Sequence, residues 1–292
     1  MRTKKMPWFE FAPNTYEIDE FDCVSVFLFV GTERALLLDT GTGVGDIRGL
    51  VEDLTDKPYD VVLTHAHMDH VGGAGWFDGV YMNQKDCGLY PFPPALEQRR
   101  SYAQMISRRE HKYYAYHVEE DICEWPKTPV IKPLTDGQVF DLGGRTLTFY
   151  ECAGHTPGEM VAIDDQNRIL FCGDACNNHL IFRTAPGDAN FVSTEEAGKN
   201  LERIWNMRDR YDVMMNSHHD YRAVGGPLSP TVMPNAIQCC KDLVAGTANI
   251  MELENPMKKM PGQEPTMTAA SLDGISWVLF NPDGIRSLNP EK

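Results

Sequence analysis

The sequence is short of positive charge. Its 292 residues include 27 Lys and Arg against 42 Asp and Glu, which gives a formal net charge of −15. Such an acidic chain repels a phosphate backbone unless a local basic patch overrides the average. The basic clusters at 2–5, 99–100 and 108–109 are short and typical of a solvated terminus or the wet face of a helix. We therefore expect no nucleic-acid partner.

Long apolar runs are also absent. The longest candidate, "CVSVFLFVG" at 23–31, has the length of a strand, whereas a membrane span needs roughly 18 apolar residues. The N-terminal "MRTKKMPWFEFAP" lacks the apolar run of a signal peptide. The 8 cysteines lack the spacing of a disulfide scaffold, which indicates reduced thiols. These absences predict a cytoplasmic protein with no membrane partner.

No repeat, low-complexity tract or long linker divides the chain, so we expect residues 1–292 to form a single domain. Apolar and β-branched runs predict a hairpin at 23–30 and 34–38, a helix at about 45–55 after the Gly-rich "DTGTGVGD", and a strand at 59–64. Further strands are expected at 79–82, 130–132, 138–141, 145–151, 160–163, 168–172, 212–216 and 275–280, and further helices at 94–118, 193–210 and 231–246. Ser193 and Glu196 form a capping-box pattern at the start of the helix at 193–210.

Three of the 9 histidines stand close together in "LTHAHMDHVGG" at 63–73. On an extended segment that leaves a strand, the spacing of His65 and His67 points both imidazoles to the same side. On a helix the two side chains would diverge by about 200°. Asp69 and His70 add an oxygen and a further nitrogen. Four ligands in so short a loop exceed what one tetrahedral ion with an open position can use, which predicts two ions.

Two ions need more ligands, and three other predicted strands end in suitable residues. His155 follows a strand in "ECAGHTPGE", Asp174 ends one in "ILFCGDACN", and His218 and His219 end another in "DVMMNSHHD". A lone His at a strand end is more often a hydrogen-bonded structural residue, and a lone Gly-Asp is usually a turn. Their occurrence together with the H-x-H-x-D-H pattern instead favours a metal site.

At these motifs the chain resembles the metallo-β-lactamase-fold hydrolases. The resemblance spans roughly residues 18–225 and rests on Asp39 in "LLLDTGTG" and then, in order, on "THAHMDH", "AGHTPGE", "CGDA" and the His of "NSHHD". It implies an α/β fold, namely a four-layer αββα sandwich of two mixed β-sheets with the site at one edge. This architecture fits the expected order of strands and helices.

The resemblance also implies a ligand set. The first metal ion would be held by His65, His67 and His155, and the second by Asp69, His70 and His218, with Asp174 bridging the two. His218 is preferred over His219 because the last ligand of the family comes directly at the strand end after a small residue, here Ser217. Asp39 would orient the metal-binding loop without binding a metal itself.

The implied chemistry is hydrolysis. Two divalent ions would lower the pKa of a shared water from about 15.7 to near 7, so that a bridging hydroxide is available at neutral pH. Asp69 would hold this nucleophile in line, as a catalytic residue. Nitrogen and carboxylate ligands favour Zn²⁺ and leave Mn²⁺ or Fe as alternatives. A thiol enzyme using Cys172 or Cys176 is set aside, because Cys172 continues an apolar strand and the family ligand at this turn is Asp174.

Particular residues disfavour some substrates of the family. Asp174 stands where many true β-lactamases have Cys or Ser, Glu159 where thioesterases of the glyoxalase II type usually have His, and Asn177 where quorum-quenching lactonases have Tyr. We expect a small-molecule substrate, namely an ester, a lactone or a thioester. A phosphodiester or a β-lactam is the alternative within the fold, and a catalytically weak metal-binding sensor or scaffold is the alternative of another class.

Two segments differ from the rest of the chain. Residues 83–134 are crowded with aromatic and charged side chains, which predicts a helical insertion that leans over the site, with simple packing against the body as the alternative. The residues expected to contact the substrate are Tyr102, Tyr113, Tyr114, Tyr116, Asn177, His179 and His219. The C-terminal extension at 231–292 has a strand pattern that we expect to complete a sheet. Its Met-rich 255–268 leaves a homo-oligomer open.

Overall fold

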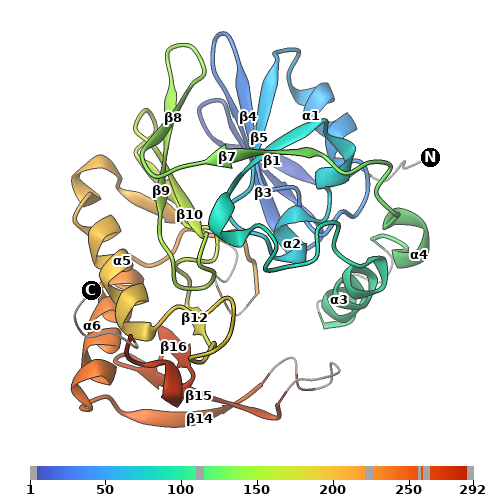
Figure 1. Cartoon of the computed structure of the whole chain (residues 1–292). Helices are drawn as coiled ribbons and strands as arrows, with labels where there is room; N and C mark the ends of the chain where they lie inside the picture. The colour runs from blue at the N-terminus through green and yellow to red at the C-terminus, as the bar shows by residue number, and fades with distance from the viewer. Residues whose placement is uncertain are drawn as a thin grey trace.

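Two β-sheets form the centre of the computed structural model, which describes residues 5–109, 115–220, 222, 226–255, 258 and 264–287 (Figure 1). The first sheet has 7 strands in the order of the chain, and the second has 5 in the order β13-β11-β10-β9-β8. The strands of the first sheet are β1 (Trp8–Ala12), β2 (Thr15–Asp19), β3 (Ser25–Val30), β4 (Ala35–Leu38), β5 (Tyr59–Val62), β6 (Gly79–Asn83) and β7 (Val130–Leu134). Those of the second are β8 (Gln138–Asp141), β9 (Thr146–Glu151), β10 (Met160–Asp164), β11 (Ile169–Phe171) and β13 (Val213–Met215).

The two sheets pack face to face over an aromatic core. The ring of Phe171 on β11 lies 4.9 Å from that of Phe27 and 4.8 Å from that of Phe29, both on β3, in edge-on contacts. These rings belong to one buried cluster that also includes Leu36 of the first sheet and Phe149 of the second. Removing this apolar surface from water holds the two sheets together.

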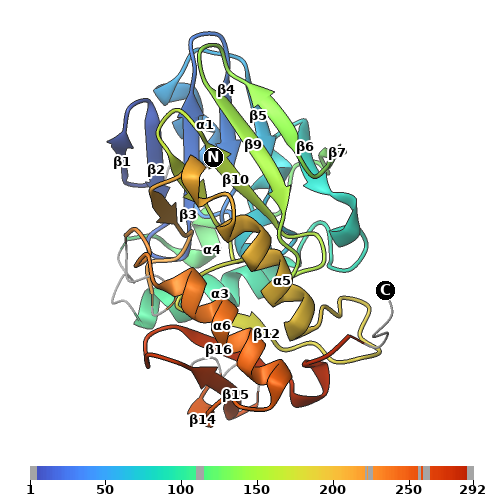
Figure 2. The same ribbon diagram turned by 90° about the vertical axis from the view of Figure 1, so that its left-hand side faces the viewer.

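Helices cover the outer faces of both sheets. The helices α1 (Ile47–Leu54) and α3 (Leu96–Arg109) share a buried cluster with the first sheet, and α5 (Thr194–Trp205) and α6 (Val232–Ala245) share one with the second (Figure 2). The side chain of Ser193 accepts a hydrogen bond from the backbone N–H of Glu196 and so begins α5, as the capping pattern predicts. The expected αββα order is therefore confirmed.

A third, smaller sheet was not expected from the sequence. Its 4 strands are β12 (His179–Phe182), β16 (Trp277–Phe280), β15 (Thr266–Ser271) and β14 (Ile250–Glu254), in that order across the sheet. Leu180 and Phe280 pack into the buried cluster that α5 and α6 share. The strand expected at 275–280 is present as β16, but it pairs in parallel with β12 in this separate sheet. Of the Met-rich 255–268, residues 256–257 and 259–263 lie outside the described part of the chain.

The helix expected at 94–118 was predicted too long. Helix α3 ends at Arg109, residues 110–114 lie outside the described part of the chain, and the backbone at His117 is extended before the short helix α4 (Val118–Asp121). The helix expected at 193–210 is also shorter in the structure. Helix α5 ends at Trp205, and Arg208–Arg210 form a separate 3-10 turn. The interpretation of 83–134 as an insertion stays a prediction.

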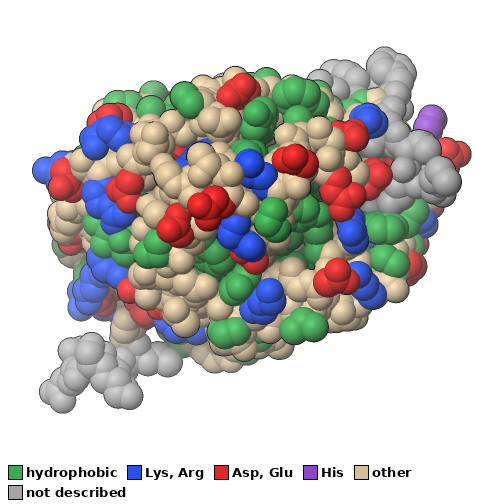
Figure 3. Space-filling model, turned by 90° about the horizontal axis from the view of Figure 1, so that it is seen from above, with side chains coloured by type: hydrophobic (Ala, Val, Ile, Leu, Met, Phe, Trp, Pro, Cys, Tyr) green, Lys and Arg blue, Asp and Glu red, His purple; other side chains and the backbone are tan. Residues whose placement is uncertain are grey.

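Among the described helices, none has both the length and the apolar character needed to cross a bilayer. On the end of the molecule that Figure 3 shows, Lys and Arg side chains are interspersed with Asp and Glu. A mixed surface of this kind creates no strong field of one sign there.

Candidate metal centre

Loops that leave several strand ends meet at one edge of the two sheets. Strands β4 and β5 run parallel, as do β11 and β13, so the loops after each pair leave on the same side. The loop after β5 carries His65 and His67 and continues into the short helix α2 (Met68–Val71). The turn after β9 carries His155, and those after β11 and β13 carry Asp174 and His218.

The structure brings all seven expected ligand residues together in three overlapping groups. Within each group the ligand atoms lie within 4.8 Å of one another. The groups are His65, His67 and His155; His65, His70 and Asp174; and Asp69, His70 and His218. The first and third groups share no residue, and the second joins them. The arrangement therefore offers two neighbouring sets of ligand atoms.

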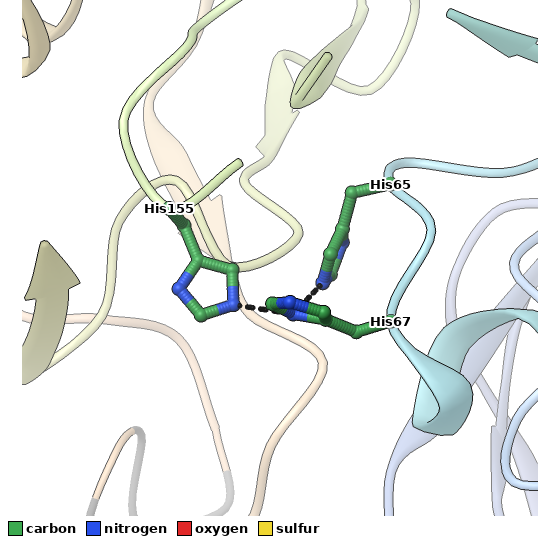
Figure 4. Close-up of side chains that lie close together, drawn as sticks. All are labelled: His65, His67 and His155. Atoms are coloured by element: carbon green, nitrogen blue, oxygen red, sulfur yellow. Dashed lines mark hydrogen bonds between the residues drawn. The ribbon is translucent and has the colours of Figure 1, made fainter. Parts of the chain in front are cut away.

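The three histidines of the first group point their rings at one another (Figure 4). His65 Nε2 lies 3.1 Å from His67 Nδ1, which lies 2.9 Å from His155 Nε2. Nitrogens at the usual distance of about 2.0–2.1 Å from a tetrahedral zinc ion are about 3.3 Å apart, which is close to these separations. The group fits a metal ion in both donor type and spacing.

Asp174 connects the first group with the third. Its Oδ2 lies 3.5 Å from His155 Nε2, and its Oδ1 lies 3.0 Å from His218 Nε2. Asp69 closes the far side, with its Oδ2 3.9 Å from His218 Nε2. Asp174 thus stands between the two sets of ligand atoms, where a bridging carboxylate would stand.

One ligand atom is buried without a hydrogen bond. His70 Nε2 has no hydrogen-bond partner among the described residues, although the side chain is fully buried. Buried polar atoms of native proteins are nearly always satisfied, so such an atom calls for an explanation. An ion held by the third group would supply it, so the residues present fit a second metal ion.

Burial sets the protonation of the first group. It lowers the pKa of His67 to about 3 and, together with the neighbouring imidazoles, brings the pKa of His65 well below its usual range. Burial likewise lowers the pKa of His155. All three rings are therefore neutral at pH 7 and offer lone pairs, which metal binding requires.

Asp39 contacts Thr64 and His70 at this edge of the sheets. It has a positive φ of 65° at the end of β4. Its carboxylate accepts hydrogen bonds from the backbone N–H and the hydroxyl of Thr64 and lies 2.9 Å from His70 Nδ1. Burial opposes the charged form of His70, but Asp39 and Asp69 outweigh it and raise the pKa of His70 to about 9. Asp39 makes the contacts of a residue that orients His70 rather than those of a ligand.

Two carboxylates that join the ligand loops were missed by the sequence analysis. Glu159 is fully buried, its Oε1 accepts the backbone N–H of Asp174 at 3.0 Å, and its Oε2 lies 3.4 Å from His65 Nδ1. Asp86 accepts hydrogen bonds from Ala66 N–H at 3.0 Å and Gly158 N–H at 2.6 Å. Glu159 lies inside "AGHTPGE" and so had a signal, whereas nothing near Asp86 in the sequence marks it.

Replacing Glu159 with Ala should weaken metal binding about 10- to 100-fold, because its side chain hydrogen-bonds the Asp174 backbone and packs beside the His65 ring. Glu159→Gln should lose less, since its amide oxygen still accepts the Asp174 N–H. Competition with a chromophoric chelator would measure the affinities. The exposed Glu97, replaced with Ala, is the control, and equal affinity in all variants would contradict this role.

The two adjacent histidines after β13 point in different directions. His218 belongs to the third group, whereas His219 Nε2 lies 2.5 Å from Glu17 Oε1 and 2.5 Å from Ser25 Oγ. His219 is thus directed at β2 and β3. The preference for His218 agrees with this geometry, and the expected substrate contact of His219 is not supported by its position.

Four tyrosines were expected to contact the substrate, and the structure describes Tyr102 and Tyr116. Tyr102 is buried, and its hydroxyl accepts a hydrogen bond from Arg222, whose Nη1 lies 3.9 Å from Asp174 Oδ2. The expected contact of Tyr116 is not supported by its position, because its hydroxyl donates to the Ala103 carbonyl and its buried ring packs on Phe21. Tyr113 and Tyr114 lie outside the described residues.

The turn after Asp174 is held by its own side chains. Asn177 is buried, and its side-chain oxygen accepts the backbone N–H of His179 at 2.7 Å, so Asn177 shapes this turn. His179 is partly exposed at the start of β12.

The Cys172 thiol is unsuited to nucleophilic catalysis. The hydrogen bond to Cys176, followed by burial, raises the pKa of the Cys172 thiol well above its usual range, which makes it a poor nucleophile.

Known proteins are similar to this chain in sequence. The family described as the metallo-beta-lactamase superfamily matches residues 20–213. "Acyl-coenzyme A thioesterase MBLAC2" of Homo sapiens is 25% identical over 51% of this chain and 57% of its own length. "Atrochrysone carboxyl ACP thioesterase dmxR1" of Cryptosporiopsis sp. is 29% identical over 51% of this chain and 37% of its own length. The chain thus spans about half or less of the length of these relatives.

A solved structure carries the same fold. The metallo-beta-lactamase family protein of Thermus thermophilus superposes with a TM-score of 0.52, at 19% identity, over 82% of this chain and 85% of that chain. Both curated relatives are named thioesterases, and thioester cleavage is a hydrolysis, so the comparisons support a hydrolase. The family match covers well over half of the sequence, and the chain belongs to the metallo-beta-lactamase superfamily.

Proposed function

We propose that the chain is a dinuclear metal-dependent hydrolase that cleaves a thioester. The observation that carries this proposal is the meeting of seven His and Asp side chains in two neighbouring ligand sets joined by Asp174. His65, His67 and His155 would hold one ion, and Asp69, His70 and His218 the other. The donors favour Zn²⁺.

When bound, two such ions supply a water whose pKa is lowered from about 15.7 to near 7 and an electrophile for the substrate oxygen. The protein contributes Asp69. Burial opposes its ionisation, but His70 and His218 outweigh burial and hold the pKa of Asp69 below its usual range. Asp69 is therefore a carboxylate at neutral pH, able to accept a hydrogen bond from the attacking water and to fix its direction.

The names of two matched relatives favour a thioester over the other substrates of the expected class. One is named for an acyl-coenzyme A thioester and the other for an acyl carrier protein thioester. A small ester and a lactone pass through the same carbonyl addition, so the ligand set serves them equally. Phosphodiesters and β-lactams are the remaining alternatives.

A substrate panel tests the proposal. The purified protein is incubated with an acyl-coenzyme A, a lactone, an aryl ester, a phosphodiester and a cephalosporin. Thiol release from the acyl-coenzyme A is followed with a chromogenic disulfide, and hydrolysis of the other four is followed by chromatography of their products. We expect the highest kcat/KM for the thioester, loss of this activity after dialysis against a chelator, and recovery with Zn²⁺. A metal-loaded protein that cleaves none of the five would be a sensor or scaffold instead.

A further inference from the structure

Tyr90 lies against the first group of histidines, in the segment between β6 and α3. Its ring centroid is 4.7 Å from that of His67, and the two planes meet at 78°, an edge-on contact. The side chain is partly exposed. Tyr90 therefore touches a ligand residue of the metal centre from outside the ligand loops.

The Tyr90 hydroxyl is held in place by a second loop. Asn190, between β12 and α5, donates a hydrogen bond from its side-chain nitrogen to this oxygen at 3.0 Å. A phenol that accepts one hydrogen bond still has its own hydrogen to donate. The described part of the chain provides no acceptor for that hydrogen. Asn190 therefore fixes the hydroxyl while leaving it free to donate to a bound molecule.

Exposure shows the side from which a substrate reaches the centre. His65 and His70 are 0% exposed and His218 is 1% exposed, so the back of the centre is closed. His67 and His155 are partly exposed, as is Tyr90. His67 and His155 are thus the members of the first group that a carbonyl group can reach from solvent, and Tyr90 lies against His67.

We propose that the Tyr90 hydroxyl donates a hydrogen bond to the carbonyl oxygen of the substrate as negative charge develops on it. This inference rests on the proposed hydrolase function. When the oxygen of water adds to the carbonyl carbon, the π-electron pair of the C=O bond moves onto the carbonyl oxygen. The pair returns to the C=O bond when the carbon–sulfur bond breaks, and the proton that the water loses ends on the departing sulfur, so that the products are a carboxylic acid and a thiol. Tyr90 keeps its proton throughout and stabilises the charge by a hydrogen bond that strengthens in the transition state.

Three variants test the role of the Tyr90 hydroxyl while the protein keeps an aromatic ring at position 90. Tyr90→Phe keeps the ring against His67 and should lower kcat about 100-fold, the size expected for one lost oxyanion donor, with KM and metal content unchanged. Asn190→Ala should lower kcat less, because the hydroxyl remains but is no longer held. The double variant should be no slower than Tyr90→Phe, since Asn190 acts through that hydroxyl. Tyr59→Phe is the matched control, because Tyr59 begins β5 and so lies at the end of that strand opposite to the loop with His65 and His67.

A binding measurement keeps the test independent of turnover. An alkyl phosphonate carries anionic oxygens on a tetrahedral centre, and calorimetry on the metal-loaded protein should show at least about tenfold weaker binding to Tyr90→Phe than to wild type. If wild type cleaves no thioester but this difference in binding persists, the substrate assignment fails and the role of Tyr90 stands. Unchanged kcat and unchanged phosphonate affinity in Tyr90→Phe, with losses only in Tyr90→Leu, would show a packing residue and overturn the inference.

Discussion

Asp69→Ala should lower the turnover of the hydrolysed substrate by about 10³-fold or more while the protein stays folded. The carboxylate supplies the charged oxygen of the third ligand group, 3.9 Å from His218 Nε2, and its depressed pKa keeps it ionised at neutral pH. Its removal takes away both the acceptor that directs the attacking water and one ligand of the second ion. The measurement is kcat with the best substrate of the panel, beside far-ultraviolet circular dichroism and Tm.

Asp69→Asn refines this test, because the amide keeps the shape and removes the charge. It should fall close to Asp69→Ala in kcat if the negative charge matters. The exposed Asp209, replaced with Ala, controls for the loss of any surface carboxylate and should leave kcat unchanged. Wild-type turnover in Asp69→Ala would refute the assigned mechanism, whatever the substrate.

Gly72→Ala should destabilise the fold by about 3 kcal/mol, at the upper end of the range for overpacking. A Cβ at this position would lie 2.1 Å from the carbonyl oxygen of Thr42 and 2.6 Å from that of Met68. Both obstacles are backbone, so no side chain can rotate away. The clash lies between the loop after β4 and the helix α2, which carries Asp69 and His70, so metal affinity should fall as well.

Thermal unfolding of the metal-free protein measures this effect, with an expected fall in Tm of roughly 6 °C or more. Gly226→Ala is the matched control, because a Cβ there meets no atom of the described residues within 4 Å. A Tm within a degree or two of wild type for Gly72→Ala would mean that the two loops are not packed as closely as described.

The ligands could be predicted from the sequence because each of them follows a strand pattern. His65, His155, Asp174 and His218 each come after an apolar run, and parallel neighbours in a sheet deliver their ends to one edge. This placement depends on local patterns and on a general rule of sheet topology. It therefore needed no knowledge of contacts between distant segments.

The residues that support the ligands could not be found in this way. Asp86 reaches the backbone N–H groups of Ala66 and Gly158, and Tyr90 meets Asn190, through contacts between segments that are far apart in the sequence. No spacing or periodicity encodes such pairs. Glu159 lies within a recognisable motif, but its contacts with His65 and Asp174 form only when these segments meet in the fold.

The missed strands have a different cause. β1 presents Trp8 and Phe9 to solvent, at 47% and 48% exposure, so its pattern lacks the buried face that marks a strand in a sequence. β12 has only four residues and follows directly on a turn at Asn177. In the overlong helix at 94–118, Tyr116 is drawn into the core against Phe21, which helical periodicity does not show. The sequence pattern was thus too weak at β1 and β12, and tertiary packing decided the position of Tyr116.

The number of metal ions per chain tests the central claim most directly. After gel filtration in Zn²⁺-containing buffer and removal of free metal, elemental analysis should find about two ions per wild-type chain. His155→Ala and His218→Ala, which belong to the two separate ligand groups, should each retain about one. Retention of no metal by the wild type, or the same metal content in all three proteins, would contradict a two-metal centre built from these residues.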